Sequence, residues 1–151
     1  MEESSLKLEV ITPERIVYSS DIDFVVVPAV EGELGVLKNH APLVAGLQIG
    51  VLRLHRGGLT RHIALGGGFL EVTDNRAIVL AESAELGTDI DVSRALAAKE
   101  RAEARLAARS PEINEARAQA SLQRALARLK AAEAEKNLGL QYQQPQRFGN
   151  E

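Results

Sequence analysis

Histidines and paired carboxylates are the side chains of this sequence that could bind a metal or move protons. His40, His55 and His62 are the three histidines, and there is no cysteine. His55 and His62 stand on either side of Gly57 and Gly58, so a hairpin there would bring them near one another. Two histidines without a third ligand make a weak metal site. We therefore expect the histidines to occupy exposed positions on a solvated strand face.

The glycines and carboxylates give no catalytic motif either. Three successive glycines at 66–68 precede a strand pattern, whereas a phosphate-binding loop would open a helix. The paired carboxylates flank turns or strand ends and have no evident acid-base partner; they are Glu31 with Glu33 and Glu82 with Glu85. The sequence contains no Walker motif and no nucleophile elbow. The pattern favours a binding or mechanical part over an enzyme.

A row of arginines in the last third of the sequence could bind a ligand. Its members recur three, four or seven residues apart and therefore share helix faces; they are Arg94, Arg101, Arg105, Arg117, Arg124 and Arg128. One interpretation is a solvated face whose arginines pair with Glu100 and Glu103, one turn away. The other is a surface for an acidic partner or a bound phosphate compound. The spacing leaves both open.

The charge of the chain divides near residue 90. Residues 1–90 hold 7 Lys and Arg against 13 Asp and Glu, whereas residues 91–136 hold 10 against 7. The formal net charge of −3 therefore combines an acidic module and a basic one. It argues against a nucleic-acid binder, whose domain is usually basic. The sequence starts with acidic residues, and no apolar run approaches the ~20 residues of a spanning helix. We expect a cytoplasmic protein.

The first 87 residues have the pattern of short strands separated by turns. Apolar and polar residues alternate at 6–11, and a β-branched and aromatic run at 24–27 stops at Pro28. Turn residues predict two hairpins, 48–55 with 59–65 around Arg56-Gly57-Gly58 and 69–73 with 76–81 around Asp74-Asn75. Many short strands at this spacing indicate an antiparallel sandwich or a flattened barrel.

From residue 88 to residue 136 the pattern changes to two helices. Asp91 can cap the first, and Ser110 with Pro111 is typical of a second helix start. So short a link favours an antiparallel hairpin. Fifteen of the 46 residues from 91 to 136 are alanine, which favours helix but offers little side chain to bury. We expect a weakly held hairpin, followed at 137–151 by a Gln-rich tail that is disordered or docks only on a partner.

Three segments resemble, in order and spacing, the epsilon-subunit family of the bacterial rotary F-type ATP synthases. They are GELGVLKNHAPL at 32–43, GGGFLEVTDNRAIVLAESAE at 66–85 and IDVSRA at 90–95. The resemblance spans residues 6 to about 136, with Lys38 where the family usually has proline and a tail that runs past the usual end. It implies an α+β chain of two domains. These are an antiparallel β-sandwich of about ten strands at 1–87 and a two-helix hairpin at 88–136.

In this family the subunit is a non-catalytic part of the central stalk, which couples proton flow to ATP synthesis. The resemblance implies that the sandwich contacts the gamma subunit and the ring of c subunits, with Glu33 and His40 as candidate ring contacts. The helices either fold against the sandwich or extend into the alpha/beta catalytic head, where they meet acidic segments and hinder ATP hydrolysis. The chain would lie at the cytoplasmic face of the inner membrane, held there only through the complex.

Some members of the family bind ATP on the folded helices as a regulatory ligand, and the resemblance extends to that motif. It implies an ATP site that requires no metal and no other cofactor. The core of this site would be Ile90, Asp91, Arg94 and Ala95, and the residues around it would be Glu85, Arg124 and Arg128. Carboxylate and backbone groups can read the adenine amino group, while arginines hold phosphates. The simpler alternative is that 90–95 is only a helix start.

Two other functions remain open at this point. One is a small enzyme with a site between sandwich and hairpin, using His40 and Glu33. The other is a coiled-coil adaptor that associates through its alanine stripe. The enzyme has no nucleophile or metal-ligand set in its favour, and the adaptor predicts self-association.

Overall fold

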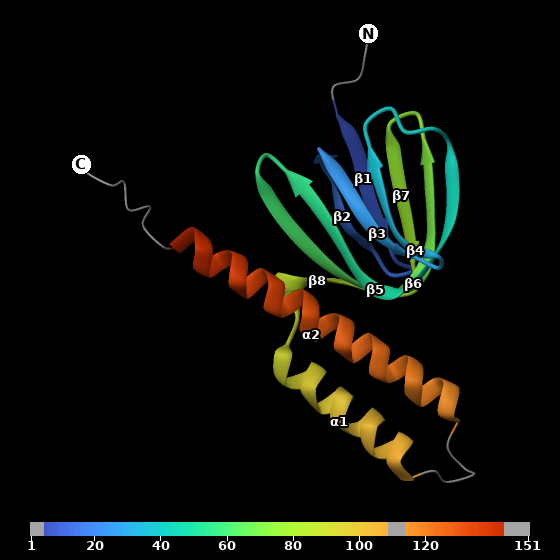
Figure 1. Ribbon diagram of the computed structural model, residues 1–151, viewed down its shortest axis with the longest axis vertical. Coiled ribbons are helices and arrows are strands. Elements are labelled where there is room, and N and C mark those ends of the chain that lie inside the picture. Colours follow the sequence, from blue (N-terminus) through green and yellow to red (C-terminus); the bar gives the residue numbers. More distant parts are fainter. Residues whose placement is uncertain (1–4, 109–113, 144–151) are drawn as a thin grey trace, which may run out of the picture.

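The computed structural model describes residues 5–108 and 114–143, with side chains as far as residue 138. Eight strands precede two long helices in the described residues (Figure 1). The strands are β1 Leu6–Ile11, β2 Ile16–Ile22, β3 Phe24–Ala29, β4 Gly32–Leu37, β5 Leu43–Arg56, β6 Leu59–Thr73, β7 Arg76–Ala81 and β8 Ala84–Leu86. A short 3-10 turn, η1 Gly87–Asp89, leads to α1 Val92–Ala108 and α2 Glu115–Gln143. This is the α+β arrangement that the sequence predicts.

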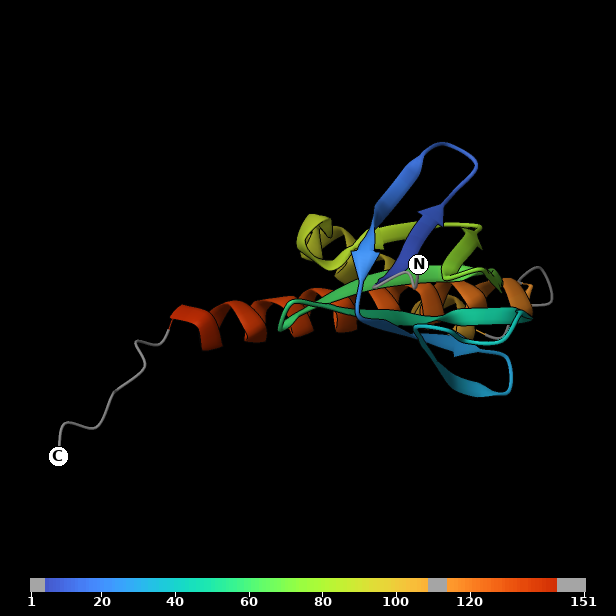
Figure 2. The same ribbon diagram turned by 90° about the horizontal axis from the view of Figure 1, so that it is seen from above.

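The strands form one sheet that curls into a sandwich, in the order β2-β1-β7-β6-β5-β3-β4, with β8 paired to β6. Figure 2 shows the β1–β2 and β3–β4 hairpins on opposite sides of the long β5–β6 pair. All strand pairs are antiparallel except β1 with β7, which run parallel. The family resemblance implies about ten strands. The eight here include β5 and β6, of 14 and 15 residues, each long enough to serve both layers.

Large aliphatic side chains fill the sandwich. The alternation seen in β1 places Leu6, Leu8 and Val10 inside, where each is fully buried. The run in β3 buries Val25 and Val27 in the same core. Fully burying such a side chain contributes ~1.5–3 kcal/mol, so the sandwich has a core of the ordinary kind despite its few aromatic residues.

Both predicted hairpin turns are confirmed. The β5–β6 turn has Gly57 and Gly58 at φ of 55° and 79°, and the β6–β7 turn has Asp74 and Asn75 at 48° and 58°. Two successive left-handed residues match the twist of the flanking strands. The long β6 strand also contains Gly68, at φ of 146°. A Cβ there would collide with the backbone of Leu80 and Ala81, so only glycine lets β7 approach this closely.

The two helices lie side by side and antiparallel, as predicted (Figure 1). Asp91 caps α1, since its Oδ1 accepts a hydrogen bond of 3.1 Å from the backbone N–H of Arg94. Asn114 caps α2 in the same way through Arg117, while the predicted start at Ser110 and Pro111 lies outside the described residues. No helix in the described ranges is long and apolar enough to cross a membrane.

The second helix is longer than expected. It continues to Gln143, through the first seven residues of the segment expected to be a disordered tail. Residues 137–143 contain leucine and glutamine, which are compatible with helix, and Gly139 costs only ~1 kcal/mol there relative to alanine. The remainder of the expected tail, 144–151, lies outside the described residues.

The buried side chains of α2 that face the sandwich are alanines. The helix lies over β5 and β6, between the sheet and α1 (Figure 1). Ala127 and Ala131 are buried there against Ala64 of β6. Gly87 has no space for a side chain, because a Cβ would stand 2.7 Å from the backbone oxygen of Ala131. The backbone of α2 therefore approaches the sandwich closely, and the half-buried side chains of Ile49, Val51 and Ile90 pack around the alanines.

Candidate functional site

Three adjoining hollows form a groove along the junction of sandwich and helices. The first, of about 260 Å³, is lined by Glu85, Asp91, Arg94, Ala95, Ala97, Ala98, Arg101 and Arg128. The second, of about 170 Å³, is lined by Arg15, Ala64, Leu65, Gly66, Ser83, Ala84, Glu85, Arg124 and Arg128. The third, of about 190 Å³, is lined by Ala98, Arg101, Ala102, Arg105, Ser121, Arg124 and Arg128. Because Arg128 lines all three hollows, we treat them as one site, the arginine groove.

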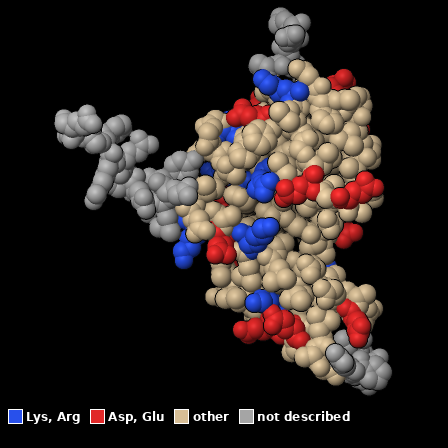
Figure 3. All heavy atoms as spheres, viewed as in Figure 1, with Lys and Arg blue, Asp and Glu red and all other residues tan. Residues whose placement is uncertain are grey.

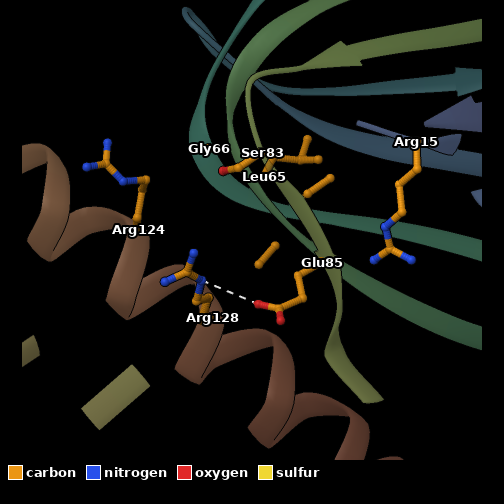
Figure 4. A pocket seen from close by; sticks show the side chains of 9 residues that line it. Arg15, Leu65, Gly66, Ser83, Glu85, Arg124 and Arg128 are labelled. Atoms are coloured by element: carbon orange, nitrogen blue, oxygen red, sulfur yellow. Dashed lines mark ion pairs between the residues drawn. The ribbon is translucent and has the colours of Figure 1, made fainter. Parts of the chain in front are cut away.

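Three elements, β8, α1 and α2, position most of the charged side chains of the groove. Glu85 lies on β8, and Asp91 stands at the cap of α1, so the chain passes along the groove as it leaves the sandwich. Arg94 follows in the first turn of α1. Arg124 and Arg128 are one turn apart on α2 and therefore share a helix face; Figure 4 shows both with Glu85 across from them.

The groove carries an excess of positive charge. Arg128 Nε lies 3.4 Å from Glu85 Oε1, and Arg124 donates a hydrogen bond of 3.1 Å to the hydroxyl of Ser121. The other arginines of the groove form no ion pair with any residue that the structure describes; these are Arg15, Arg94, Arg101 and Arg105. Figure 3 shows Lys and Arg side chains along the middle of this face, between sandwich and helices. Such a groove is suited to a polyanion.

Most of the residues implied by the ATP motif meet in this groove. Glu85, Asp91, Arg94, Ala95 and Arg128 all line the first hollow. Arg124 lines the two adjoining hollows instead. Ile90 faces away from them, since it packs, half-buried, against Ala64, Ala127 and Ala131.

The sequence-based set leaves out three arginines of the groove. Arg101 and Arg105 were detectable from their spacing, because they follow Arg94 by seven and eleven residues on the same face of α1. Arg15 was not, since it comes from the β1–β2 loop and reaches the groove only through the fold of the sandwich.

The two candidate ring contacts lie at opposite ends of β4. Glu33 is near the β3–β4 turn, and its Oε2 lies 3.3 Å from Arg53 Nη2. His40 follows the other end of the strand, where its Nδ1 stands 2.8 Å from the backbone oxygen of Ala41. Neither residue lines the arginine groove. The structure thus gives no geometry for an enzyme that uses both between sandwich and hairpin.

The burial of His62 contradicts the prediction made from the sequence. Predicted to be exposed, it is 8% exposed, because α2 crosses β6 at this position. Strand β8 ends at Leu86 opposite Ile63, so the backbone N–H of His62 lies just beyond the end of that pairing. Glu135 of α2 accepts a hydrogen bond from it, with an N···O distance of 2.6 Å.

The buried His62 side chain adds a titratable group to this contact. Its Nδ1 lies 3.5 Å from Glu135 Oε1 but forms no hydrogen bond with any described residue. Burial lowers the pKa of His62, and the nearby Glu135 carboxylate offsets only part of that shift. His55, in contrast, stacks on Phe24 and pairs with Thr60 across the hairpin, so it is not the cross-strand partner of His62. The described residues hold no cluster of three potential metal-ligating side chains.

Comparison with known proteins identifies the family. Residues 5–87 match the beta-sandwich domain model of the ATP synthase delta/epsilon chain, and residues 88–133 match its long alpha-helix domain model. The chain is 60% identical to the ATP synthase epsilon chain of Syntrophomonas wolfei over 114 residues, 75% of this chain and 83% of that one. It is 58% identical to the epsilon chain of Carboxydothermus hydrogenoformans over 106 residues, 70% of this chain and 79% of that one. The chain belongs to the ATP synthase epsilon family.

Two solved structures resemble this epsilon-family chain in fold. A chain in a cryo-EM structure of Euglena gracilis mitochondrial ATP synthase, described as OSCP/F1/c-ring, has a TM-score of 0.69. It is 24% identical, and the alignment covers 90% of this chain and 84% of that one. A chain in the central stalk/c-ring structure of the Tetrahymena thermophila enzyme has a TM-score of 0.54 at 12% identity, covering 87% of this chain and 98% of that one. At these sequence identities the similarity shows a shared fold and nothing more.

Proposed function

We propose that the chain is a central-stalk rotor subunit of an F-type ATP synthase, peripheral to the membrane on its cytoplasmic face. In this role it performs no catalysis itself. The sandwich binds the gamma subunit and the c ring, and the helical hairpin regulates ATP hydrolysis by folding and extending. The family assignment supports the assembly role, and so do the similar structures, which are described as an F1/c-ring and a central stalk.

The observation that carries the regulatory part is the alanine seam under α2. Ala127 and Ala131 meet Ala64 there, and each buried CH₂-sized group contributes only ~0.8 kcal/mol. Two polar contacts add to it, Glu135 with the backbone of His62 and Arg128 with Glu85. A helix that buries alanines against half-buried Ile49, Val51 and Ile90 and makes two polar contacts can leave the sandwich at a lower cost than a helix that buries large side chains. Released, it presents its arginines to acidic segments of the alpha/beta catalytic head.

The arginine groove gives ATP a way to control this step. Glu85 and Asp91 supply carboxylates for the adenine amino group, and arginines from both helices supply donors for the phosphates. The groove exists only while the helices are folded, so a bound nucleotide favours the folded form. A ligand at 100 times its dissociation constant stabilises the state that binds it by ~2.7 kcal/mol. That is enough to shift a marginal hairpin.

An exposed apolar patch on the sandwich fits the gamma subunit. Val44, Phe69 and Leu80 are 72%, 62% and 54% exposed. Phe69 pairs with Leu80 on one side and with Gly46, two residues from Val44, on the other, so the three side chains share one face. Contiguous apolar surface of this kind marks protein contacts. The c ring would meet Glu33 or His40, and their separation along β4 means that each must be tested alone.

The switch is tested by locking α2 on the sandwich. Because the chain has no cysteine, Ala64→Cys with Ala127→Cys introduces one pair across the seam. The variant is added to a cognate catalytic head and gamma subunit that lack this chain, and ATP hydrolysis is measured after oxidation and after reduction. Inhibition should disappear on oxidation and return on reduction, while either single variant should not respond. Hydrolysis that is unaffected by the lock, or no binding to gamma, contradicts the proposal.

Nucleotide sensing is tested separately by calorimetric titration of the full chain with ATP. Arg124→Ala and Arg128→Ala should weaken binding about tenfold or more, as expected when a charged hydrogen bond to phosphate is lost. Arg117→Ala is the matched control, because Arg117 is exposed on the same helix and lines no part of the groove. Absence of binding at millimolar ATP would remove the sensing role and leave the assembly role intact.

A further inference from the structure

A fourth hollow opens at the end of the sandwich core, beside the turn of the β5–β6 hairpin. It has a volume of about 540 Å³ and shares no lining residue with the arginine groove. Leu54, which is fully buried in the core, lines it together with Tyr18, Leu59 and Leu86. Pockets that hold small organic molecules have volumes of about 300–1,000 Å³ and mostly apolar walls. The hollow therefore has the size and the walls of a ligand site.

Two arginines stand on the face of the hairpin that otherwise points into the core. Figure 1 shows this hairpin as the long β5–β6 pair, in whose register Leu54 lies opposite Arg61 and Arg56 lies opposite Leu59. Residues directly opposite one another, and residues two apart on one strand, project from the same face of a sheet. All four side chains thus share the inner face. The apolar alternation of the core ends here in two leucines interleaved with two cations.

These arginines have no ionic partner in the part of the chain that the structure describes. The Asp23 carboxylate accepts a hydrogen bond of 2.9 Å from the backbone N–H of Gly57 and does not line the hollow. A guanidinium group offers a planar fork of N–H donors that matches a carboxylate. Arginines beside apolar walls therefore suit an anion that carries an apolar chain, and they disfavour a cation.

The hollow also borders the connection between the sandwich and the helices. Leu86 and Thr88 line it, whereas Gly87, between them, lies against Ala131 of α2. No residue of α1 or α2 lines the hollow. A ligand there would contact the sandwich and the start of the connection, without any need for the arginine groove.

We propose that this hollow binds an amphipathic carboxylate, an aliphatic chain that ends in a carboxylate group. The chain lies against Leu54, Leu59 and Leu86, and the carboxylate pairs with Arg56 and Arg61. The site is separate from the ATP site proposed above, since the two have no residue in common. It gives the sandwich a ligand site of its own.

Titration of the full chain with decanoate, below the concentration at which decanoate forms micelles, tests the site. Nuclear magnetic resonance of leucine methyl groups follows the binding, and the signals of Leu54 and Leu86 should shift. Butyrate has the same charged group on a short chain, and decyltrimethylammonium has a chain of the same length with the opposite charge. Each should bind about tenfold more weakly or less, because one lacks the apolar contact and the other the charged hydrogen bonds.

Substitutions locate the charged end of the ligand. Arg56→Ala and Arg61→Ala should each weaken decanoate binding about tenfold, as expected when a charged hydrogen bond is lost. Leu59→Glu should abolish it, because the new carboxylate pairs with the arginines and occupies the apolar wall. Arg76→Ala is the matched control, since Arg76 is an exposed arginine of the sandwich that lines none of the four hollows.

Four outcomes overturn the inference and leave the proposed function standing. The first is no binding to the wild-type chain at millimolar decanoate. The second is equal binding of decyltrimethylammonium, which would show an apolar surface without selection for charge. The third is an affinity that neither arginine substitution changes. The fourth is a set of shifts confined to leucines of α1 and α2.

Discussion

The sandwich and the helical hairpin are built on two different interiors. Leucine, isoleucine and valine fill the sandwich, whereas the buried residues of α1 and α2 in the described ranges are all alanine: Ala95, Ala102, Ala118, Ala125, Ala127 and Ala131. A large aliphatic side chain contributes about two to four times as much on burial as a methyl group. The difference teaches that the sandwich gains more stability from its interior than the hairpin does, as the proposed switch requires.

Truncating a side chain in the sandwich core should have the largest effect on stability. Leu52→Ala removes most of a fully buried side chain and should lower the free energy of unfolding by about 2–5 kcal/mol. Amide hydrogen exchange of β5 and β6 measures it. Leu96→Ala on α1, where the side chain is 43% exposed, should cost less than about 1 kcal/mol. Equal losses would contradict the contrast between the two interiors.

A single methyl group at Gly87 should release the hairpin. A Cβ at this position collides with the backbone of Ala131 and with Glu135, and overpacking of this kind costs about 1–3 kcal/mol. The distance between labels at Ser20→Cys and Lys130→Cys should increase while the sandwich stays folded. Gly35→Ala is the matched control, since a Cβ there meets nothing within 4 Å. An unchanged distance in Gly87→Ala would mean that α2 is not held by this close approach.

Removing the Glu135 side chain should loosen the far end of the seam. Glu135→Ala leaves the backbone N–H of His62 without its acceptor, and a buried donor without a partner costs about 1–3 kcal/mol. Glu135→Gln keeps an acceptor oxygen and should lose less. The same pair of labels reports docking of α2, with Glu133→Ala as an exposed control on the same helix. Alanine and glutamine variants that behave alike would exclude the hydrogen bond as the cause.

Acidification should weaken the docking of α2 on the sandwich, and this should be the smallest of the four effects. Because burial lowers the pKa of His62 when α2 is docked, the released form binds the proton more readily. Docking is therefore fully stable above the ordinary histidine pKa of 6.5 and weakens as the pH falls below it. The charged and titratable neighbours that face His62 are Glu135 on α2 and Arg53 and His55 on β5.

Label distances measured between pH 7.5 and 5.5 report this dependence, in a range where most carboxylates stay ionised. His62→Gln should remove it. Stronger docking at pH 5.5 would show instead that the protonated imidazole pairs with Glu135.

Sequence-based predictions succeeded where the structure depends on near neighbours in the chain. The alternation at 6–11, the turns at Gly57-Gly58 and Asp74-Asn75 and the cap at Asp91 all follow from local backbone preferences. They failed for His62, because whether a strand residue is exposed depends on which helix crosses it. The end of α2 was missed for a different reason, because Gly139 is typical of a helix end but here lies within the helix.

For the candidate site the same division holds. The sequence by itself determined two modules of opposite charge, the helical spacing of the arginines and the family to which the motifs belong. Only the tertiary structure decided that Arg15 lines the same hollow as Arg124 and Arg128, and that Glu135 reaches the backbone of His62. The physical reason is that helical and strand periodicities act over a few residues. The register of α2 on the sheet, in contrast, is set by the fit of alanines, Gly87 and β6, which lie far apart in the chain.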